Sequence, residues 1–130
     1  MTPMELKHAC VMVVDDQAVM RLLIVGSLRK LGVQRLHAFA DATSALAALA
    51  STRPDLVLTD VQMRPIDGIG LVRAIRVLPD LQLAATRVVF VTGDTSDSAR
   101  QVAEALGVCG FMAKPPTPAA LADTLGRVLA

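Results

Sequence analysis

The sequence predicts an α/β fold with a five-stranded, doubly wound parallel sheet that carries helices on both faces. Short apolar runs alternate with longer amphipathic stretches five times along the chain. Repeated strand–helix units of this kind form parallel sheets with right-handed crossover connections. The apolar runs are nearly continuous, which is typical of strands that are buried on both faces.

The first predicted strand, Cys10–Val14, is a short run rich in Val. The pattern then becomes helical from Gln17 to Leu31, where one helix face gathers the apolar side chains of Met20, Leu23, Ile24, Leu28 and Leu31. Gly32 suits the end of this helix, since glycine readily adopts the left-handed conformation found there. Leu22 and Val25 lie opposite the predicted core face.

The second unit begins with a predicted strand over 35–39. Asp41 is a suitable N-cap for the Ala-rich helix that follows it to about Ala50. Pro54 marks a break, and the third strand is predicted over 56–59.

The third helix is predicted over 69–78, after a loop that contains Asp67-Gly68. The clearest strand in the chain, with the sequence RVVFV, covers 87–91. A fourth helix is predicted over 99–106, and Gly107 ends it.

The fifth strand is predicted over 110–113. Thr117 and Pro118 open the last helix as its N-cap and first-turn proline. No linker, repeat or low-complexity segment divides the chain, so we expect a single domain over 1–130. Its core covers about 8–130, and residues 1–7 form a short N-terminal extension.

The amino-acid composition and net charge exclude several classes of protein. The chain of 130 residues is 53% hydrophobic, but its only aromatic residues are three Phe, so the core must be aliphatic. Thirteen basic and twelve acidic residues give a net charge of +1, which argues against binding to nucleic acid or an anionic membrane. No apolar run is long enough for export or for crossing a bilayer, and we expect a cytoplasmic protein. Cys10 and Cys109 are expected to be buried, reduced thiols, because no metal-ligand spacing accompanies them.

Polar side chains follow four of the five predicted strands. Asp15 and Asp16 follow the first strand, Asp60 the third, Thr92 the fourth and Lys114 the fifth. Parallel sheets bind ligands beyond the carboxyl ends of their strands, so these groups should meet at one edge. Three carboxylates would repel one another without a counter-charge, and Mg²⁺ suits an oxygen-only site that also holds a phosphate oxygen. The set therefore predicts a site for a small oxyanion such as a phosphoryl group.

Each of these features also has an ordinary structural explanation. An Asp pair after a strand is often a helix N-cap, and Asp60 alone fits a turn, as does the segment from Thr92 to Asp94. Independent turns rarely place this set in this order at strand ends, so the joint arrangement favours a site.

The segments that carry these residues resemble the receiver domains of two-component response regulators, which have a flavodoxin-like fold. The matching segments are VMVVDD at 11–16, LVLTD at 56–60, IDG at 66–68, VVFVTG at 88–93 and FMAKP at 111–115. The resemblance covers the chain from about Cys10 onward.

The resemblance implies a role for each matching residue. Asp16 would bind Mg²⁺ directly and Asp15 mainly through water. Asp60 would be the phosphoacceptor and a further metal ligand, and the backbone carbonyl of Gln62 would complete the protein's share of the metal shell. Lys114 would pair with the phosphoryl group.

The resemblance also implies a switch. Thr92 would supply the hydroxyl that moves toward the phosphoryl oxygen, and Phe111 occupies the aromatic switch position that turns inward with it. A simple core role for Phe111 remains open. The bond from Lys114 to Pro115 is commonly cis in such domains.

Three departures from the family pattern affect the loops around the site. Arg64 stands where a proline is usual, with Pro65 one residue later, so the loop shape or the access of phosphodonors is expected to differ. Pro116 replaces an apolar residue. Gln62 and Asp94 occupy variable positions that are expected to tune phosphoryl lifetime.

The resemblance implies a single-domain response regulator that is a signalling switch and not an enzyme, apart from its own phosphorylation and dephosphorylation. Its partners would be a histidine kinase or histidine phosphotransfer protein and a downstream protein, and it would be a monomer or a phosphorylation-dependent dimer. Two alternatives are a degenerate receiver that acts as a constitutive binding module and an aspartate-dependent phosphatase. Gln62 and the compact length argue against the phosphatase.

Two surfaces are candidates for partners. Exposed Leu22 and Val25 on the first helix would pack on the helix pair of a kinase or phosphotransfer protein. The face of the fourth helix, fifth strand and last helix would contact the downstream protein, and it offers Arg100, Glu104 and Arg127.

Overall fold

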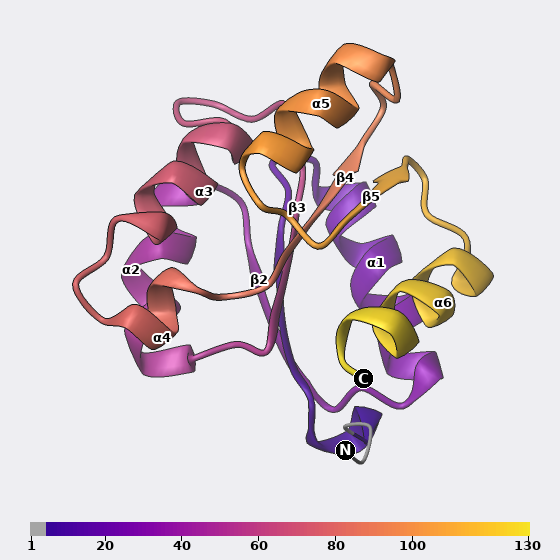
Figure 1. Cartoon of the computed structure of the whole chain (residues 1–130). Coiled ribbons are helices and arrows are strands. Elements are labelled where there is room, and N and C mark those ends of the chain that lie inside the picture. The colour runs from indigo at the N-terminus through magenta and orange to yellow at the C-terminus, as the bar shows by residue number, and fades with distance from the viewer. Residues whose placement is uncertain (1–4) are drawn as a thin grey trace.

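The computed structural model describes residues 5–130 and contains the predicted five-stranded parallel sheet (Figure 1). The strand order is β2-β1-β3-β4-β5, and every neighbouring pair is parallel. The strands are β1 (Cys10–Val14), β2 (Arg35–Phe39), β3 (Leu56–Thr59), β4 (Val88–Thr92) and β5 (Gly110–Ala113). The predicted fold class is therefore confirmed, and β3 is the central strand, with β1 and β4 on either side of it.

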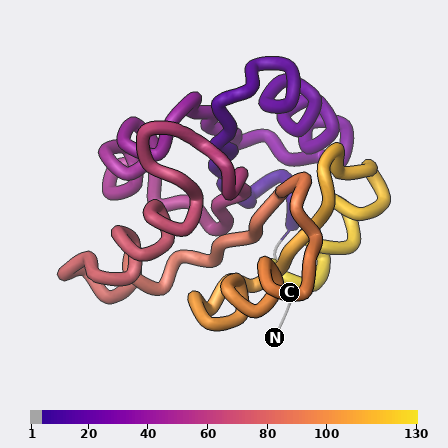
Figure 2. The backbone as a smooth tube through the Cα atoms, turned by 90° about the horizontal axis from the view of Figure 1, so that it is seen from above, coloured from indigo at the N-terminus to yellow at the C-terminus, as the bar shows by residue number. Residues whose placement is uncertain are grey.

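Helices cover both faces of this sheet. The helices are α1 (Ala18–Leu31), α2 (Ala42–Thr52), α3 (Gly68–Arg76), α4 (Leu81–Ala84), α5 (Asp97–Ala105) and α6 (Pro118–Val128). In the view from above, α1 and α6 lie beside each other on one side, and α2 and α3 lie on the other (Figure 2). The predicted fourth and fifth helices correspond to α5 and α6.

Two aliphatic cores form because the side chains of each strand alternate between the faces. The α1/α6 face buries, among others, Val11, Val13, Leu28, Leu56 and Leu125. The opposite face buries Met12, Val57, Leu71, Ile75 and Phe90. All five residues of β1 are buried, as are all five of β4, which explains their continuous apolar sequences.

The helix ends follow the predicted capping residues. The Asp41 carboxylate accepts a hydrogen bond from the backbone N–H of Ser44 at 2.7 Å, and Thr117 caps α6 with Pro118 in its first turn. Gly32 and Gly107 both adopt positive φ, at 108° and 70°. The predicted and observed boundaries of the elements differ by at most two residues.

Two short elements were not predicted. One is α4, whose N-cap Asp80 accepts hydrogen bonds from the N–H groups of Gln82 and Leu83. The other is the 3₁₀ helix η1 (Leu6–His8). Elements of three or four residues are too short to show a helical period. Residues 1–4 of the predicted N-terminal extension lie outside the described residues, and Leu6 packs against the α1/α6 core.

The predicted faces of α1 need correction at two positions. Leu23, which we placed on the core face, is 54% exposed, whereas Val25, which we placed opposite it, packs against the core. Successive residues of a helix are about 100° apart, so both side chains lie at the borders of the Ile24–Leu28 stripe. The contact with α6 decides which border is covered. Leu22 is 72% exposed, as expected.

The prediction for the two cysteines is right for Cys10 and wrong for Cys109. Cys10 is buried in β1, and burial raises the pKa of its thiol. Cys109 is exposed because β5 begins one residue later, at the edge of the sheet. Both thiols are free.

Alkylation of the native protein with iodoacetamide at mildly alkaline pH is expected to add one adduct, on Cys109. The thiolate is the reactive form, and Cys10 is both shielded and held protonated. Intact mass before and after unfolding in guanidinium chloride should show one and then two adducts. Two adducts on the native protein would contradict the burial of Cys10, and Cys109→Ser should remove the native adduct.

Within residues 5–130, no helix has the length and apolar character needed to cross a membrane.

Candidate functional site

Three carboxylates meet where the neighbouring strands β1 and β3 end. Asp15 and Asp16 follow β1, and Asp60 follows β3. One oxygen from each residue lies within 4.8 Å of the others. Asp15 is 1% exposed and Asp60 is 5% exposed, whereas Asp16 is open to solvent. The parallel pairing of β1 with β3 brings these residues together, because it aligns the two carboxyl ends.

Lys114 supplies the positive charge of this cluster. Its Nζ lies 2.9 Å from Asp15 Oδ2 and 2.9 Å from Asp60 Oδ2. The backbone N–H of Lys114 donates to the carbonyl of Thr92 at 3.0 Å, which fixes the start of the loop after β5. Burial disfavours the charged ammonium, but the two carboxylates outweigh it and raise the pKa of Lys114 above its ordinary value. Lys114 is therefore a permanent cation at this edge.

Only one of the two carboxylate oxygens of Asp15 accepts a hydrogen bond. Its Oδ1 accepts a hydrogen bond from the backbone N–H of Gln17 at 2.8 Å. Its Oδ2 is buried and has no hydrogen-bond partner, so the Lys114 contact is an ion pair without hydrogen-bond geometry. A buried oxygen of this kind beside two more carboxylates fits a hard divalent cation, since Mg²⁺ selects oxygen ligands. The side chains that could hold it are those of Asp15, Asp16 and Asp60, and the role of the Gln62 backbone carbonyl stays a prediction.

Two further residues contact this cluster and were missed by sequence reasoning. Gln17 accepts a hydrogen bond from Lys114 Nζ through Oε1 at 3.3 Å. Arg21 donates to the backbone carbonyl of Asp15 at 2.7 Å. Their positions in the sequence gave one usable signal: Gln17 lies two residues after Asp15, the spacing at which an Asp side chain accepts from the backbone in a turn.

The loop from β3 to α3 holds Asp60 in place. The backbone N–H of Gln62 donates to Asp60 Oδ1 at 3.2 Å, and the N–H of Gly68 donates to the carbonyl of Val61 at 2.8 Å. Gly68 lies so close to this segment that a Cβ atom there would be 2.2 Å from the carbonyl oxygen of Asp60. Glycine at this position lets α3 begin directly against the segment that carries Asp60.

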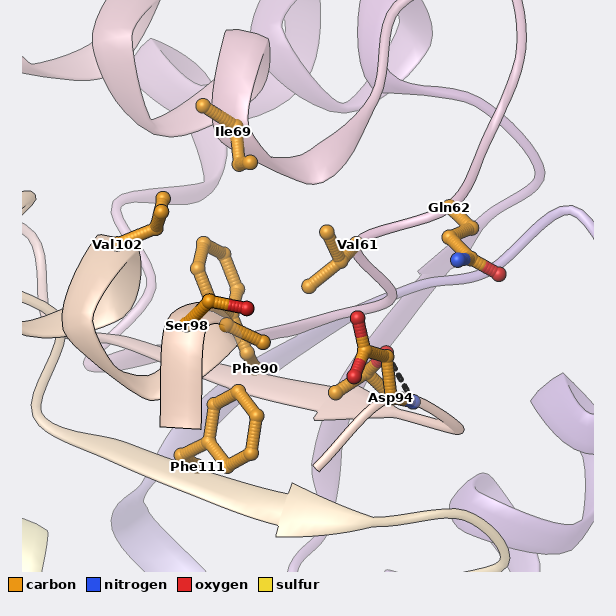
Figure 3. Close-up of a pocket in the computed structure, with 10 residues that line it drawn as sticks. Val61, Gln62, Ile69, Phe90, Asp94, Ser98, Val102 and Phe111 are labelled. Atoms are coloured by element: carbon orange, nitrogen blue, oxygen red, sulfur yellow. Dashed lines mark hydrogen bonds between the residues drawn. The ribbon is translucent and has the colours of Figure 1, made fainter. Parts of the chain in front are cut away.

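Thr92 and Phe111 lie beside the cluster without joining it. Thr92 is 1% exposed, and its hydroxyl accepts a hydrogen bond from the backbone N–H of Asp94 at 3.1 Å. Phe111 is half-buried on β5 and borders a cavity of about 260 Å³ that is lined mostly by apolar side chains. The close-up shows Phe90, Val61, Ile69 and Val102 around the same cavity (Figure 3).

The loops beside the site contain the residues that depart from the family pattern. The peptide bond from Lys114 to Pro115 is cis, as expected, and so is the bond from Arg64 to Pro65. Arg64 is exposed and lines a second, polar hollow together with Asp16 and Gln62.

Comparison with known families decides the relationship. The model of the response regulator receiver domain matches residues 11–126. The chain belongs to the response regulator receiver domain family. The receiver domain is also similar to two curated chemotaxis proteins. It is 34% identical over 119 residues to the chemotaxis protein CheY of Pseudomonas aeruginosa, covering 91% of this chain and 94% of that protein. It is 33% identical over 107 residues to the probable chemotaxis protein CheY of Rhizobium etli, covering 82% of this chain and 81% of that one.

The backbone of this receiver domain is also similar to those of solved structures. The chemotaxis response regulator CheY4 of Vibrio cholerae superposes with a TM-score of 0.83 at 33% identity, covering 93% of this receiver domain and 98% of that chain. A response regulator receiver protein of Pseudomonas putida superposes with a TM-score of 0.80 at 31% identity, covering 90% of this receiver domain and 94% of that chain. The receiver domain is thus a CheY-like signalling domain of a two-component system.

Proposed function

We propose that this receiver domain accepts a phosphoryl group on Asp60 from a histidine kinase or a histidine phosphotransfer protein, in a Mg²⁺-dependent reaction, and that this switches its binding to a downstream protein. The whole chain acts as one receiver domain with a core over 8–130, in the cytoplasm. It is a signalling switch that catalyses only its own phosphorylation and dephosphorylation.

The observation that carries this proposal is the environment of the Asp60 carboxylate. Oδ2 pairs with Lys114 and Oδ1 accepts from the Gln62 N–H, so the carboxylate is held in one orientation at the rim of the sheet. Phosphoryl transfer depends on positioning and on charge neutralisation more than on covalent help from the protein. An oriented carboxylate beside a cation and two metal-binding acids meets these requirements.

The surrounding residues would bind the metal, contact the phosphoryl group and transmit the change to the surface. Mg²⁺ would be held by Asp15, Asp16, Asp60 and the backbone carbonyl of Gln62. Bound Mg²⁺ supplies a counter-charge for the phosphoryl oxygens. Lys114 keeps its positive charge and turns from the carboxylate pair toward the phosphoryl group. The Thr92 hydroxyl leaves the Asp94 N–H and donates to a phosphoryl oxygen, so the loop after β4 moves.

This movement links the site to the surface that partners contact. The loop after β4 leads into α5, and Phe111 on the neighbouring β5 is the aromatic partner of the switch. The output surface is the α5–β5–α6 face with Arg100, Glu104 and Arg127. Hydrolysis of the acyl phosphate resets the switch, and phosphorylation acts through a monomer or through a dimer that it induces.

The test is to incubate the domain with acetyl phosphate and Mg²⁺ and to measure intact mass, followed by peptide mapping. We expect one added phosphoryl group on the peptide that contains Asp60, and no adduct after the metal is removed with EDTA. Adding back Mg²⁺ should restore labelling. Beryllofluoride, which mimics the acyl phosphate without turnover, serves as the control for a short phosphoryl lifetime.

Absence of an adduct, together with no beryllofluoride-induced change in thermal stability, would reject the proposal. The chain would then be a receiver that binds partners constitutively. Release of phosphate from small phosphate esters with multiple turnovers would instead indicate a phosphatase.

The donor protein is expected to dock on an apolar patch of α1 formed by Val19, Leu22 and Leu23. These side chains are 72%, 72% and 54% exposed. The helix starts immediately after the Asp15–Asp16 loop, so a helix pair packed on the patch would present a phosphohistidine to Asp60. Exposed apolar clusters of this kind commonly mark protein contacts.

Leu22→Glu is expected to slow phosphotransfer from the donor protein at least ten-fold while labelling by acetyl phosphate is unchanged, because a charge would be buried in the docked complex. Leu81→Glu is the matched control, since Leu81 is 82% exposed on α4 at the far end of the sheet. The measurement is the rate of transfer from the phosphorylated donor. An equal loss with both phosphodonors would show that Leu22 acts through the fold and not through docking.

A further inference from the structure

Arg100 of α5 stacks on the ring of Phe111. The guanidinium carbon lies 5.0 Å from the ring centroid, within the range of a cation–π interaction. Arg100 is exposed, and its side chain has no hydrogen bond or ion pair with any other residue in 5–130. The aromatic ring is therefore the one partner that fixes this guanidinium within the described part of the chain.

Phe111 separates two hollows of the domain. On its inner side lies the cavity of about 260 Å³, which reaches Thr92 and Asp94 at the site. On its outer side lies a groove of about 300 Å³ between α5, β5 and α6, which Arg100 and Arg127 also line. Arg100 lines the outer groove and is not among the residues that line the inner cavity.

The inner cavity has room for the ring. An apolar cavity of about 150 Å³ is large enough to bind benzene, and this one is larger and lined by Val61, Ile69, Phe90 and Val102. Burying an aromatic ring there is favourable. The half-buried ring of Phe111 lines this cavity without filling it, and the Arg100 stack is a contact that a turn into the cavity would break.

We infer that Arg100 is a latch that holds Phe111 in its outward position and so sets how readily this receiver switches. The inference rests on the proposed function, in which Phe111 turns inward when Asp60 is phosphorylated. Arg100 is a positioning residue that acts on the ring and not on the phosphoryl group. When the ring turns inward, the guanidinium is released into the outer groove, whose shape and exposed charge change together.

The expected effect follows from the strength of one exposed cation–π contact, which corresponds to about a two- to five-fold change in an equilibrium. Arg100→Ala should raise the ratio of inward to outward ring by this factor in the unphosphorylated domain. Arg100→Lys should give a smaller change, since lysine keeps the charge but loses the planar stack. Arg73→Ala is the control, because Arg73 is also an exposed arginine on a helix but does not line the outer groove.

The chain offers a direct way to observe the ring. It has three Phe and no Tyr or Trp, so protein labelled with para-fluorophenylalanine gives three fluorine NMR signals. Phe111→Leu identifies the signal of Phe111. The solvent isotope shift between H₂O and D₂O reports whether that ring is exposed, and the signals of Phe39 and Phe90 report whether each variant is folded.

In the resting domain we expect the Phe111 signal of Arg100→Ala to lose part of its solvent isotope shift, because the ring is buried more of the time. The signal of Arg73→Ala should match that of wild type. An unchanged Phe111 signal in Arg100→Ala, with the other two signals in place, would overturn the latch. The comparison is made without phosphorylation. A failure of the proposed function gives a different result. In that case beryllofluoride and Mg²⁺ would not move the Phe111 signal of the wild-type domain, independently of the result for Arg100→Ala.

Discussion

Asp60→Asn is expected to take up no phosphoryl group from acetyl phosphate under conditions that fully label the wild-type domain. The amide that replaces the carboxylate is not a nucleophile toward phosphorus. The substitution also removes the negative charge that pairs with Lys114 at 2.9 Å and one of the three carboxylates of the acidic cluster. The fold should survive, because the change relieves repulsion among three acids and keeps the size of the side chain.

Intact mass and peptide mapping measure this outcome. Asp123→Asn is the matched control, since it makes the same chemical change at an exposed position on α6, away from the site. It should be labelled like wild type. Full labelling of Asp60→Asn would show that the acceptor is another residue, and mapping would identify it. The proposed role of Asp60 would then fail, although the family membership would stand.

Gly68→Ala is expected to destabilise the domain by about 3 kcal/mol, at the upper end of the cost of overpacking. The new Cβ would lie 2.2 Å from the carbonyl oxygen of Asp60 and 2.9 Å from the Cα of Val61. Both neighbours are backbone atoms, so no side chain can rotate out of the way. Either α3 or the segment that carries Asp60 must move, and labelling by acetyl phosphate should fall together with stability.

The same substitution at Gly126, Gly126→Ala, is expected to have the opposite effect on stability. Gly126 is exposed within α6, and a Cβ there would meet nothing within 4 Å. Alanine is preferred over glycine inside helices by about 1 kcal/mol, so this variant should gain stability. Urea unfolding measures both changes. Equal stability of Gly68→Ala and wild type would mean that the loop relaxes at little cost and does not require glycine.

The architecture and most of the candidate site followed from features that are local in sequence. Continuous Val-rich runs indicated buried parallel strands, and residues immediately after those runs had to share one edge of the sheet. This reasoning was enough to group Asp15, Asp16, Asp60 and Lys114 at that edge. Caps were equally local, because Asp41 and Thr117 act on N–H groups three residues away.

Features that depend on contacts between distant segments were not predictable in the same way. The close approach of Gly68 to Asp60 exists only once α3 is folded against the end of β3. The contact between Gln17 and Lys114 joins residues 97 positions apart, and nothing in either neighbourhood specifies the other. The exposure of Leu23 and Cys109 was decided by which element covers the border of a helix or strand, which periodicity alone does not define.

The crowding of three acids at one rim also has an evolutionary consequence. A site that holds like charges together is maintained at the expense of conformational stability, and function is what selects for it. In a descendant that no longer received phosphoryl groups, neutral replacements of Asp16 would be favoured first. Asp16 is exposed and makes no side-chain hydrogen bond or ion pair within residues 5–130, so its loss would relieve repulsion without breaking a contact. Under the proposed function, loss of Asp16 would therefore be the first change expected once selection to bind a divalent cation ends.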